Sequence, residues 1–461
     1  MGRSRRKTYH VSSYCDEVDD GRVGAAVTSP DRPSADIPRA ALAFAALLVL
    51  TVVVFGPMLS MSITAENVQW LYWADQTPTS SLLRPDSFWE WRPLPSITVW
   101  LQYRLLHLNH LAVHFYVNLL LWTICAWFVY QIVERLTHAF APALAAAAVV
   151  ATDMRVVEPI LTFGRTTVMA CLFGLAGYLL IVNAREARLT RSRWVATSLL
   201  LIAAPLCKEF GIAFAGAASV WGLVERRRDV ASSGMAAVTL YAVLRVAIVG
   251  GAMQPYCEET GYFFDLRTVC FGSAGGAGVA QVAYTVAAGV AGGLVPALFG
   301  MVGKISLAVD PRWFAASAVW LAFAAVGWWK GPTSVRLTIL VVTLNAVAGF
   351  MMYRPRNHAV AFCASGIAVG VGLAVVNAAT RRTPWPRTAR AALAMAVAAT
   401  LASQALGTRA EVVDQVADEG TSDPCQALIE GIRADRAFVT KIKSAYHMTN
   451  PDCKPVVIPG N

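Results

Sequence analysis

Long apolar stretches alternate with short polar segments along most of this chain. A helix needs about 20 mostly apolar residues to cross the hydrocarbon core of a bilayer. Many stretches reach this length, and others, rich in alanine, come close to it. The pattern therefore predicts an all-α polytopic membrane protein with about 11 transmembrane helices. The expected spans lie at about residues 40–60, 111–133, 139–152, 166–183, 194–207, 209–224, 234–252, 313–329, 335–352, 358–379 and 389–407.

The composition of the chain also indicates a membrane protein. The 461 residues are 56% hydrophobic and only 15% charged, whereas soluble domains carry about 25% charged residues. The net charge of +10 could indicate a nucleic-acid partner, but the Lys and Arg residues gather in short runs between apolar stretches. Such runs are typical of the loops that set membrane topology. We therefore expect the lipid bilayer as a partner and no nucleic acid.

Four basic runs set the expected orientation, because cytoplasmic loops carry an excess of Lys and Arg. They are Arg185–Arg193, Glu225–Asp229, Lys330–Arg336 and Arg381–Arg390. With a cytoplasmic N-terminus, all four face the cytoplasm only if the Gly/Ala-rich stretch Gly275–Gly303 crosses the membrane zero or two times. We expect this stretch to lie along the outer surface as an interfacial helix. The C-terminus then lies outside the cytoplasm.

This topology divides the chain into three parts. Residues 1–38 are polar and predict a disordered cytoplasmic tail. Residues 39–408 form the transmembrane domain, in which residues 61–110 are a first outer loop and residues 252–311 an outer loop with the interfacial helix. Residues 409–461 repeat apolar residues at helical spacing and predict a small extracytoplasmic α-helical tail.

Two pairs of cysteines lie in polar segments on the expected outer side, where disulfides persist. Cys257 and Cys270 flank one short polar loop, and Cys425 and Cys453 lie in the final segment. We expect two local disulfides; the alternative is four unrelated thiols. A zinc site is not expected, because neither pair has C-x-x-C spacing or a neighbouring His.

Ionisable residues concentrate at the outer ends of the expected spans. Taken singly, such a residue is most often a solvated side chain, but their gathering on one side favours a functional site. Carboxylates can deprotonate an acceptor hydroxyl, and Arg and Lys can hold a phosphate. These residues are Glu66, Asp75, Arg92, Glu158, Arg165, Lys208, Glu209 and Arg354.

Five short motifs appear in order along the chain. They are W-R-P-L-P-S-I-T at 91–98, H-F-Y-V-N-L-L-L-W at 114–122, V-E-P-I-L-T-F-G-R at 157–165, P-L-C-K-E-F-G-I-A at 205–213 and L-R-V-A-I-V-G-G at 244–251. In this order and spacing the chain resembles the GT-C fold glycosyltransferases. Among these it is similar to the membrane part of the O-mannosyltransferase-like proteins that carry tetratricopeptide repeats after their membrane spans.

The resemblance implies a transferase that moves a sugar, such as mannose, from a polyprenyl-phosphate donor to an acceptor hydroxyl of a protein or glycan at the extracytoplasmic face. No cofactor is expected, and no His/carboxylate cluster in the sequence argues for a bound metal ion. Two other functions stay open: a catalytically silent GT-C-like binding or scaffold protein, and a transporter of lipid-linked glycans. The Ala-, Arg- and Gly-rich composition favours a bacterial plasma membrane; in a eukaryote we expect the endoplasmic reticulum.

The resemblance also places the catalytic base. The family carries an acidic pair just after its first span, and the matching residues here are Ala65 and Glu66. Glu66 is therefore the expected base, with Asp75 as its substitute. The alternative is that Glu66 only caps a helix that begins after Thr64.

The remaining family positions match cationic and supporting residues. Three of them are expected to contact the donor phosphate: Arg165, Lys208 and Arg354. Five are expected to support the site or the acceptor: Arg92, Glu158, Glu209, His114 and Asn118. His114 and Asn118 lie one turn apart on the second span, where an interhelical hydrogen-bonding pair is the alternative to a catalytic role. Glu209 can also simply pair with Lys208.

Overall fold

The computed structural model describes residues 36–60, 70, 73–74, 77–83, 91–106, 111–161, 164–185, 187–249, 263–264, 269–270, 311–350 and 358–419. All structural statements below concern these residues. The chain forms two units, Met1–Ala41 and Leu42–Asn461. Of the first unit, only the beginning of helix α1 is described, so the predicted disordered tail at residues 1–38 lies almost entirely outside the described residues.

The described chain is helical apart from a two-residue antiparallel pairing between β1 (Phe263–Phe264) and β2 (Val269–Cys270). Its α-helices are α1 (Asp36–Phe55), α3 (Pro93–Leu106), α4 (Leu111–Thr137), α5 (Phe140–Ala151), α6 (Val157–Leu161), α7 (Thr166–Asn183), α8 (Arg191–Cys207), α9 (Ile212–Val224), α10 (Arg228–Val249), α14 (Pro311–Lys330), α15 (Thr333–Arg336), α16 (Thr338–Phe350), α17 (His358–Thr380) and α18 (Pro386–Glu419). The 3₁₀ helices are η1 (Gly56–Ser60), η2 (Thr79–Ser81), η3 (Met154–Val156) and η4 (Glu209–Gly211).

Each expected span coincides with helix, as the run of apolar side chains dictates. Within the described residues, six helices are long and apolar enough to cross a membrane, or seven if the bent pair α5 and η3–α6 forms one span. Two shorter apolar helices cover Glu209–Val224 and Thr333–Asn345. The prediction of an α-helical, multi-pass membrane protein is therefore confirmed, whereas the count of 11 crossings stays a prediction.

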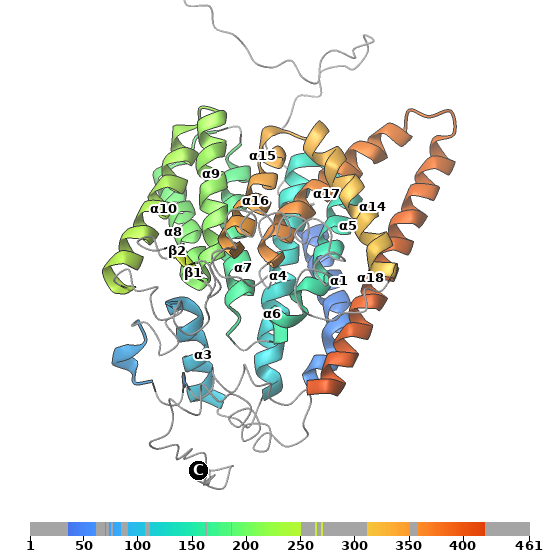
Figure 1. The fold of residues 1–461 in the computed structure, drawn as a ribbon. Helices are drawn as coiled ribbons and strands as arrows, with labels where there is room; N and C mark the ends of the chain where they lie inside the picture. The colour runs from blue at the N-terminus through green and yellow to red at the C-terminus, as the bar shows by residue number, and fades with distance from the viewer. Residues whose placement is uncertain are drawn as a thin grey trace, which may run out of the picture. The chain divides into compact units, whose positions relative to one another are not determined.

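Close helix packing depends on small residues. A Cβ atom at Gly372 of α17 would lie 1.8 Å from the carbonyl oxygen of Phe323, and one at Gly327 of α14 would lie 2.0 Å from that of Ala368. The backbones of α14 and α17 therefore touch, which is how membrane helices gain packing contacts without a hydrophobic driving force. Figure 1 shows the two helices next to each other.

The connections between helices separate into two ends of the Leu42–Asn461 unit. Figure 1 shows the α9–α10 turn, α15 and the α17–α18 connection at one end, and α3 and α6 toward the other. The first set contains three of the basic runs found in the sequence, at residues 225–229, 330–336 and 381–390. The fourth run, at residues 185–193, lies next to the first of these, because Arg227 donates hydrogen bonds to the carbonyls of Ala184 and Ala187. We call these the basic end and the α3 end.

Helix α18 continues beyond the predicted domain boundary at residue 408, without a break, to Glu419. The reason is that its last turns still pack: Thr408 is fully buried and donates to the carbonyl of Thr152 at 2.8 Å. Val412 is also fully buried, and Arg409 donates to the carbonyl of Val53. Residues up to 419 therefore belong to the helical domain, and the predicted tail beyond them lies outside the described residues.

Candidate functional site

The tight turn between α8 and α9 positions two of the predicted site residues. Lys208 ends α8 in an extended conformation, and its carbonyl accepts a hydrogen bond from the Gly211 amide at 2.8 Å. A Cβ atom at Gly211 would lie 2.5 Å from the carbonyl oxygen of Ala204, so only glycine fits there. The turn thus holds Lys208 and Glu209 rigidly at the α3 end.

Glu209 is the centre of an ion-pair cluster drawn from three separate parts of the chain. Its Oε2 accepts from Arg92 Nη2 at 3.3 Å, and its Oε1 accepts from Arg245 Nη1 at 3.1 Å. Arg245 Nη1 also donates to the Tyr241 hydroxyl at 3.3 Å. The three charged side chains are only 7–19% exposed. Sparse hydration strengthens such charge-assisted hydrogen bonds.

The cluster determines what Glu209 can do chemically. Burial alone would raise the pKa of its carboxyl, but Arg92 and Arg245 outweigh burial and lower that pKa to about 2. A carboxylate with so low a pKa, and with a guanidinium on each oxygen, is a poor proton acceptor at neutral pH. Glu209 therefore orients the two arginines. The described ion pairs of Glu209 are with Arg92 and Arg245, and the charge of Lys208 also helps to lower the pKa of Glu209. The pairing with Lys208 stays a prediction.

Arg92 reaches Glu209 because a helix begins directly after it. Pro93 occupies the first position of α3, where its missing amide hydrogen is not needed. The Ser96 amide donates to the carbonyl of Arg92 at 3.1 Å, which closes the first turn. The preceding Trp91 donates from Nε1 to the carbonyl of Leu83 at 3.0 Å. The motif W-R-P is thus a local device that presents Arg92 at a helix start.

A second polar contact links the turn to α7. Lys208 Nζ donates to Thr167 Oγ1 at 3.1 Å, and Thr167 is 97% buried in the first turn of α7. Thr167 lies two residues after Arg165, which is the N-cap residue of the same helix. Lys208 therefore lies near the start of α7, which Arg165 caps.

Arg165 is held in a strained and buried conformation. Its backbone is left-handed, with φ 42° and ψ 21°, which a residue with a side chain adopts only under constraint. Its Nη2 donates to Gln102 Oε1 of α3 at 2.5 Å. Burial lowers the pKa of Arg165 to about 10, so the guanidinium keeps its charge at neutral pH. Strained backbone of this kind is frequent at functional sites.

His114 and Asn118 flank the same region from α4, and both are fully buried. His114 is near enough to Arg165 for their charges to interact. Asn118 Nδ2 donates to the carbonyl of Ile160 in α6 at 2.7 Å, which confirms the interhelical hydrogen bond predicted for it. Asn118 therefore helps to fix the end of α6, just before the segment that carries Arg165.

The loop at residues 61–110, which is expected on the outer side, also reaches this segment. A Cβ atom at Gly164 would lie 2.3 Å from the indole of Trp70, so the Trp70 ring lies directly on the Gly164 backbone. Trp70 makes an edge contact with Trp73, their ring centroids being 6.2 Å apart. Trp70 is four residues after Glu66 in the sequence. The loop expected to supply the base thus contacts the segment of Arg165.

A buried ion pair lies beside α17 at the same end. Arg155 donates to the two carboxylate oxygens of Asp153 from Nε and Nη2, each at 2.8 Å, and both side chains are at most 1% exposed. The Arg155 guanidinium also lies 3.9 Å from the centroid of the Phe362 ring. Such a bidentate pair with a cation–π contact fixes the α5–α6 connection.

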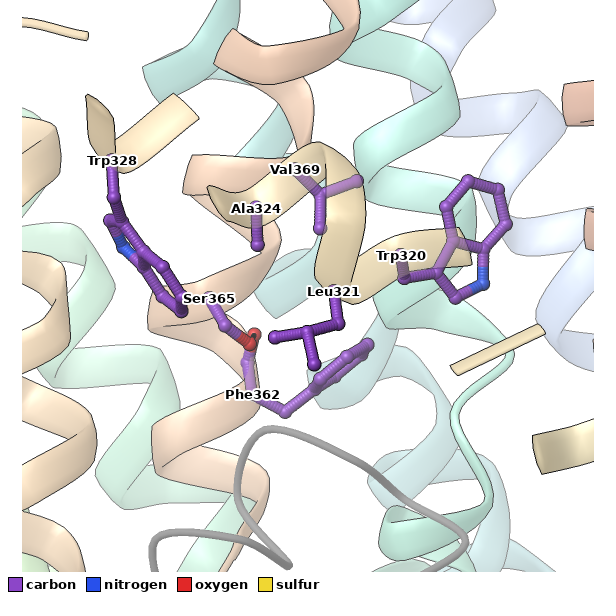
Figure 2. Close-up of a pocket in the computed structure, with 7 residues that line it drawn as sticks. All are labelled: Trp320, Leu321, Ala324, Trp328, Phe362, Ser365 and Val369. Atoms are coloured by element: carbon purple, nitrogen blue, oxygen red, sulfur yellow. Dashed lines mark hydrogen bonds between the residues drawn. The ribbon is translucent and has the colours of Figure 1, made fainter. Parts of the chain in front are cut away.

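Phe362 also lines a small, partly open apolar pocket between α14 and α17 (Figure 2). Trp320 and Trp328 form its walls, but their indole nitrogens donate elsewhere, to Gln404 Oε1 at 2.6 Å and Thr338 Oγ1 at 2.9 Å. The pocket therefore presents apolar ring surface and can take only a small apolar group.

Gln404 continues this contact into α18. Its Nε2 donates to the carbonyl of Val149 at 2.8 Å and to Thr152 Oγ1 at 3.0 Å. The network thus runs from α14 through α18 to the end of α5, beside the Asp153–Arg155 pair.

Some predicted site residues lie outside the described residues. They are Glu66, Asp75, Arg354, Cys257, Cys425 and Cys453, together with the side chains of Glu158 and Cys270, whose backbones belong to α6 and β2. Cys125, Cys171, Cys207 and Cys363 are described, buried and free. Across the described ranges, no three His, Cys, Asp or Glu side chains are grouped as metal ligands would be.

The structure adds residues that the sequence did not single out: Arg245, Tyr241, Gln102 and Thr167. Arg245 carried a usable signal, since it is a lone arginine inside an apolar helix and within one of the five motifs. The other three had none. No protein-family model matches this chain, and no curated protein matches it significantly.

Proposed function

We propose that this protein is an integral-membrane glycosyltransferase of the GT-C type. It moves a sugar from a polyprenyl-phosphate donor to a hydroxyl of a protein or glycan acceptor. The observation that carries the proposal is that cationic residues of four different motifs lie at the α3 end. Arg92 and Arg245 both pair with Glu209 of the fourth motif. Arg165 donates to Gln102 of α3, and Lys208 donates to Thr167 of α7. The motifs alone suggest the family; their convergence supports a shared site.

The chemistry of these side chains fits the donor. A polyprenyl phosphate carries negative charge on the group that leaves, and guanidinium and ammonium groups stabilise charge that develops there. Helix α3 connects two cations. Arg92 lies directly before its first residue, and Arg165 donates a hydrogen bond to Gln102, which lies ten residues after Arg92. At 1.5 Å per residue these two positions are about 15 Å apart.

The proposal includes an orientation. The basic end faces the cytoplasm, by the excess of Lys and Arg in its connections, and the α3 end faces outward in a bacterial plasma membrane. In this arrangement the donor's isoprenoid chain stays in the outer leaflet, and Glu66 serves as the base that deprotonates the acceptor hydroxyl.

The test is transfer of radiolabelled sugar from a panel of polyprenyl-phosphate sugars in membranes that contain the protein. We expect label in the protein or glycan fraction for one sugar. Glu66→Gln should lower the rate at least about 100-fold, as loss of a general base does. Lys208→Met should raise the donor concentration needed for half-maximal rate. The matched controls Glu225→Gln and Lys330→Met change the same residue types at the basic end and should leave transfer unchanged.

Two outcomes would overturn parts of the proposal. If no sugar in the panel is transferred above membranes without the protein, the enzymatic function is wrong. If the donor still binds in a Lys208-dependent way without turnover, the protein is a catalytically silent GT-C-like binding protein. The alanine at position 65, where the family has an acid, favours this second candidate over the transporter.

A further inference from the structure

The connection between α17 and α18 is the most basic exposed segment of the described chain outside the proposed site. It reads R-R-T-P-W-P-R-T-A-R from Arg381 to Arg390. The sequence contains no Asp or Glu between Asp310 and Glu411, so the four arginines have no acidic residue near them in the chain. Ion pairs recorded for the described residues include none of them. Their charge is available to a partner.

The segment is an ordered turn. The amides of Arg381 and Arg382 donate to the carbonyls of Ala378 and Ala379 at 3.2 and 3.0 Å, which continues the last turn of α17. Trp385 stands between two prolines, whose φ angles are fixed, and its carbonyl accepts from the Ala389 amide at 2.9 Å. The side chains of Arg381, Arg382, Arg387 and Arg390 are all exposed, and Trp385 is 76% exposed. These five residues are called the arginine–tryptophan patch below.

The end of α14 presents the same combination at the same end of the bundle (Figure 1). Trp329 is 77% exposed, and Lys330 Nζ lies 5.7 Å from the centroid of its ring. Exposing a tryptophan ring to water is unfavourable, but the same ring is favoured at the headgroup level of a bilayer, because it is amphipathic. Cations beside it can then contact the lipid phosphates.

Helix α18 supplies the surface for the rest of a lipid. Directly after the patch, its long apolar stretch is only 17% buried within the protein, and Met395 is 67% exposed. A phospholipid whose phosphate binds the patch can therefore lay its acyl chains along α18. A nucleic acid or a soluble acidic protein would satisfy the arginines but would leave this apolar surface uncovered, so the continuity of charge and apolar surface favours a lipid.

We propose that the arginine–tryptophan patch binds the headgroups of anionic phospholipids in the leaflet at the basic end. The arginines donate to the phosphate oxygens, and the Trp385 ring lies among the headgroups and glycerol groups. Anionic lipids are selected over zwitterionic ones because only they carry net charge to match four arginines. Binding holds the first half of α18, which the protein itself covers little, while Gln404 and Thr408 hold the second half. The proposal is independent of the sugar-transfer function.

The test is native mass spectrometry of the purified full-length protein with phosphatidylglycerol and phosphatidylcholine of identical acyl chains. Each arginine near a membrane surface contributes about fivefold in affinity. The quadruple variant R381Q/R382Q/R387Q/R390Q should therefore bind phosphatidylglycerol about 600-fold more weakly, with phosphatidylcholine binding unchanged. Higher salt should weaken phosphatidylglycerol binding to the wild type alone.

The matched control is R191Q/R193Q/R226Q/R228Q, which removes the same charge from exposed side chains of the α7–α8 and α9–α10 connections at the same end. It should keep phosphatidylglycerol binding within about twofold. If the quadruple variant does not fold, the single variants R382Q and R387Q are tested in its place. Each should bind phosphatidylglycerol about fivefold more weakly than the wild type. Equal losses in patch and control variants, or equal binding of both lipids, would overturn the proposal. So would patch-dependent binding of an oligonucleotide or acidic peptide with unchanged lipid binding.

Discussion

Removing the charge of Glu209 should destabilise the protein, because two buried arginines depend on it. In the variant Glu209→Gln, Arg92 and Arg245 keep their positions but lose the carboxylate that lies 3.3 and 3.1 Å from them. Breaking a fully buried ion pair by removing one partner costs about 3–5 kcal/mol. The side chains here keep 7–19% exposure, so water reduces the cost to about 2–3 kcal/mol.

A second route to the magnitude starts from the pKa of Glu209. Its ordinary value of 4.5 falls to about 2 in the folded protein. At 1.36 kcal/mol per pH unit, this difference corresponds to about 3 kcal/mol of stabilisation of the ionised form. Both magnitudes come from the same ion pairs with Arg92 and Arg245, and the expected loss is about 2–3 kcal/mol.

The assay is thermal unfolding of the purified protein in lipid nanodiscs, with wild type and variant compared at pH 7. The midpoint for Glu209→Gln should fall by several degrees. Glu225→Gln, at an exposed position at the end of α9, is the matched control and should leave the midpoint unchanged. A double-mutant cycle with Arg245→Met should give a coupling of at least about 1 kcal/mol. Wild-type stability for Glu209→Gln, or no coupling, would refute the role assigned to the cluster.

Three further outcomes follow from the structure. The pKa of Glu209 is lower in the folded than in the unfolded protein, so its ion pairs stabilise the fold fully above pH ~4.5 and lose this effect toward pH 2. The difference in unfolding midpoint between wild type and Glu209→Gln should therefore shrink as the pH falls over that range. A difference that stays constant would contradict the lowered pKa. Arg227→Ala removes bonds to three carbonyls and to Asp229 and should cost about 2 kcal/mol in thermal unfolding, whereas Arg228→Ala should be neutral. Gly372→Ala should destabilise the protein by about 1–3 kcal/mol and lower its unfolding midpoint, because the added Cβ atom forces α14 and α17 apart. Gly56→Ala should leave the midpoint unchanged, because the space around Gly56 is open.

The helices were predictable because apolar runs directly reflect burial in lipid or protein. All the expected spans are helical, and the segment 166–183 matches α7 residue for residue. The end of α18 was not predictable, since the polar residues after 408 remain helical only because Thr408 and Val412 pack against other elements. Length and hydropathy likewise cannot decide whether α5, with 12 residues, crosses alone or with α6.

The candidate site shows a similar division. Short-range sequence pattern identified Arg165, Lys208 and Glu209, because ionisable residues at the ends of apolar spans are conspicuous. It could not identify their partners, since the contacts join residues 36 to 117 positions apart. Gln102 and Thr167 are ordinary helix residues until the fold places a cation beside them.

The arrangement of the site follows from where a membrane protein can place charge. A charged group is costly at mid-membrane and tolerable at helix ends, so a cluster of cations in a membrane protein must come from several helix ends that meet. Arg92 begins α3, Arg165 caps α7, Lys208 ends α8, and Arg245 lies in the last turns of α10. Glu209 links two of these ends, and Thr167 and Gln102 link the others to α7 and α3. Changing Glu209 should therefore disturb the positions of two cations at once, so variants of Glu209, Arg92 and Arg245 should show non-additive effects on stability.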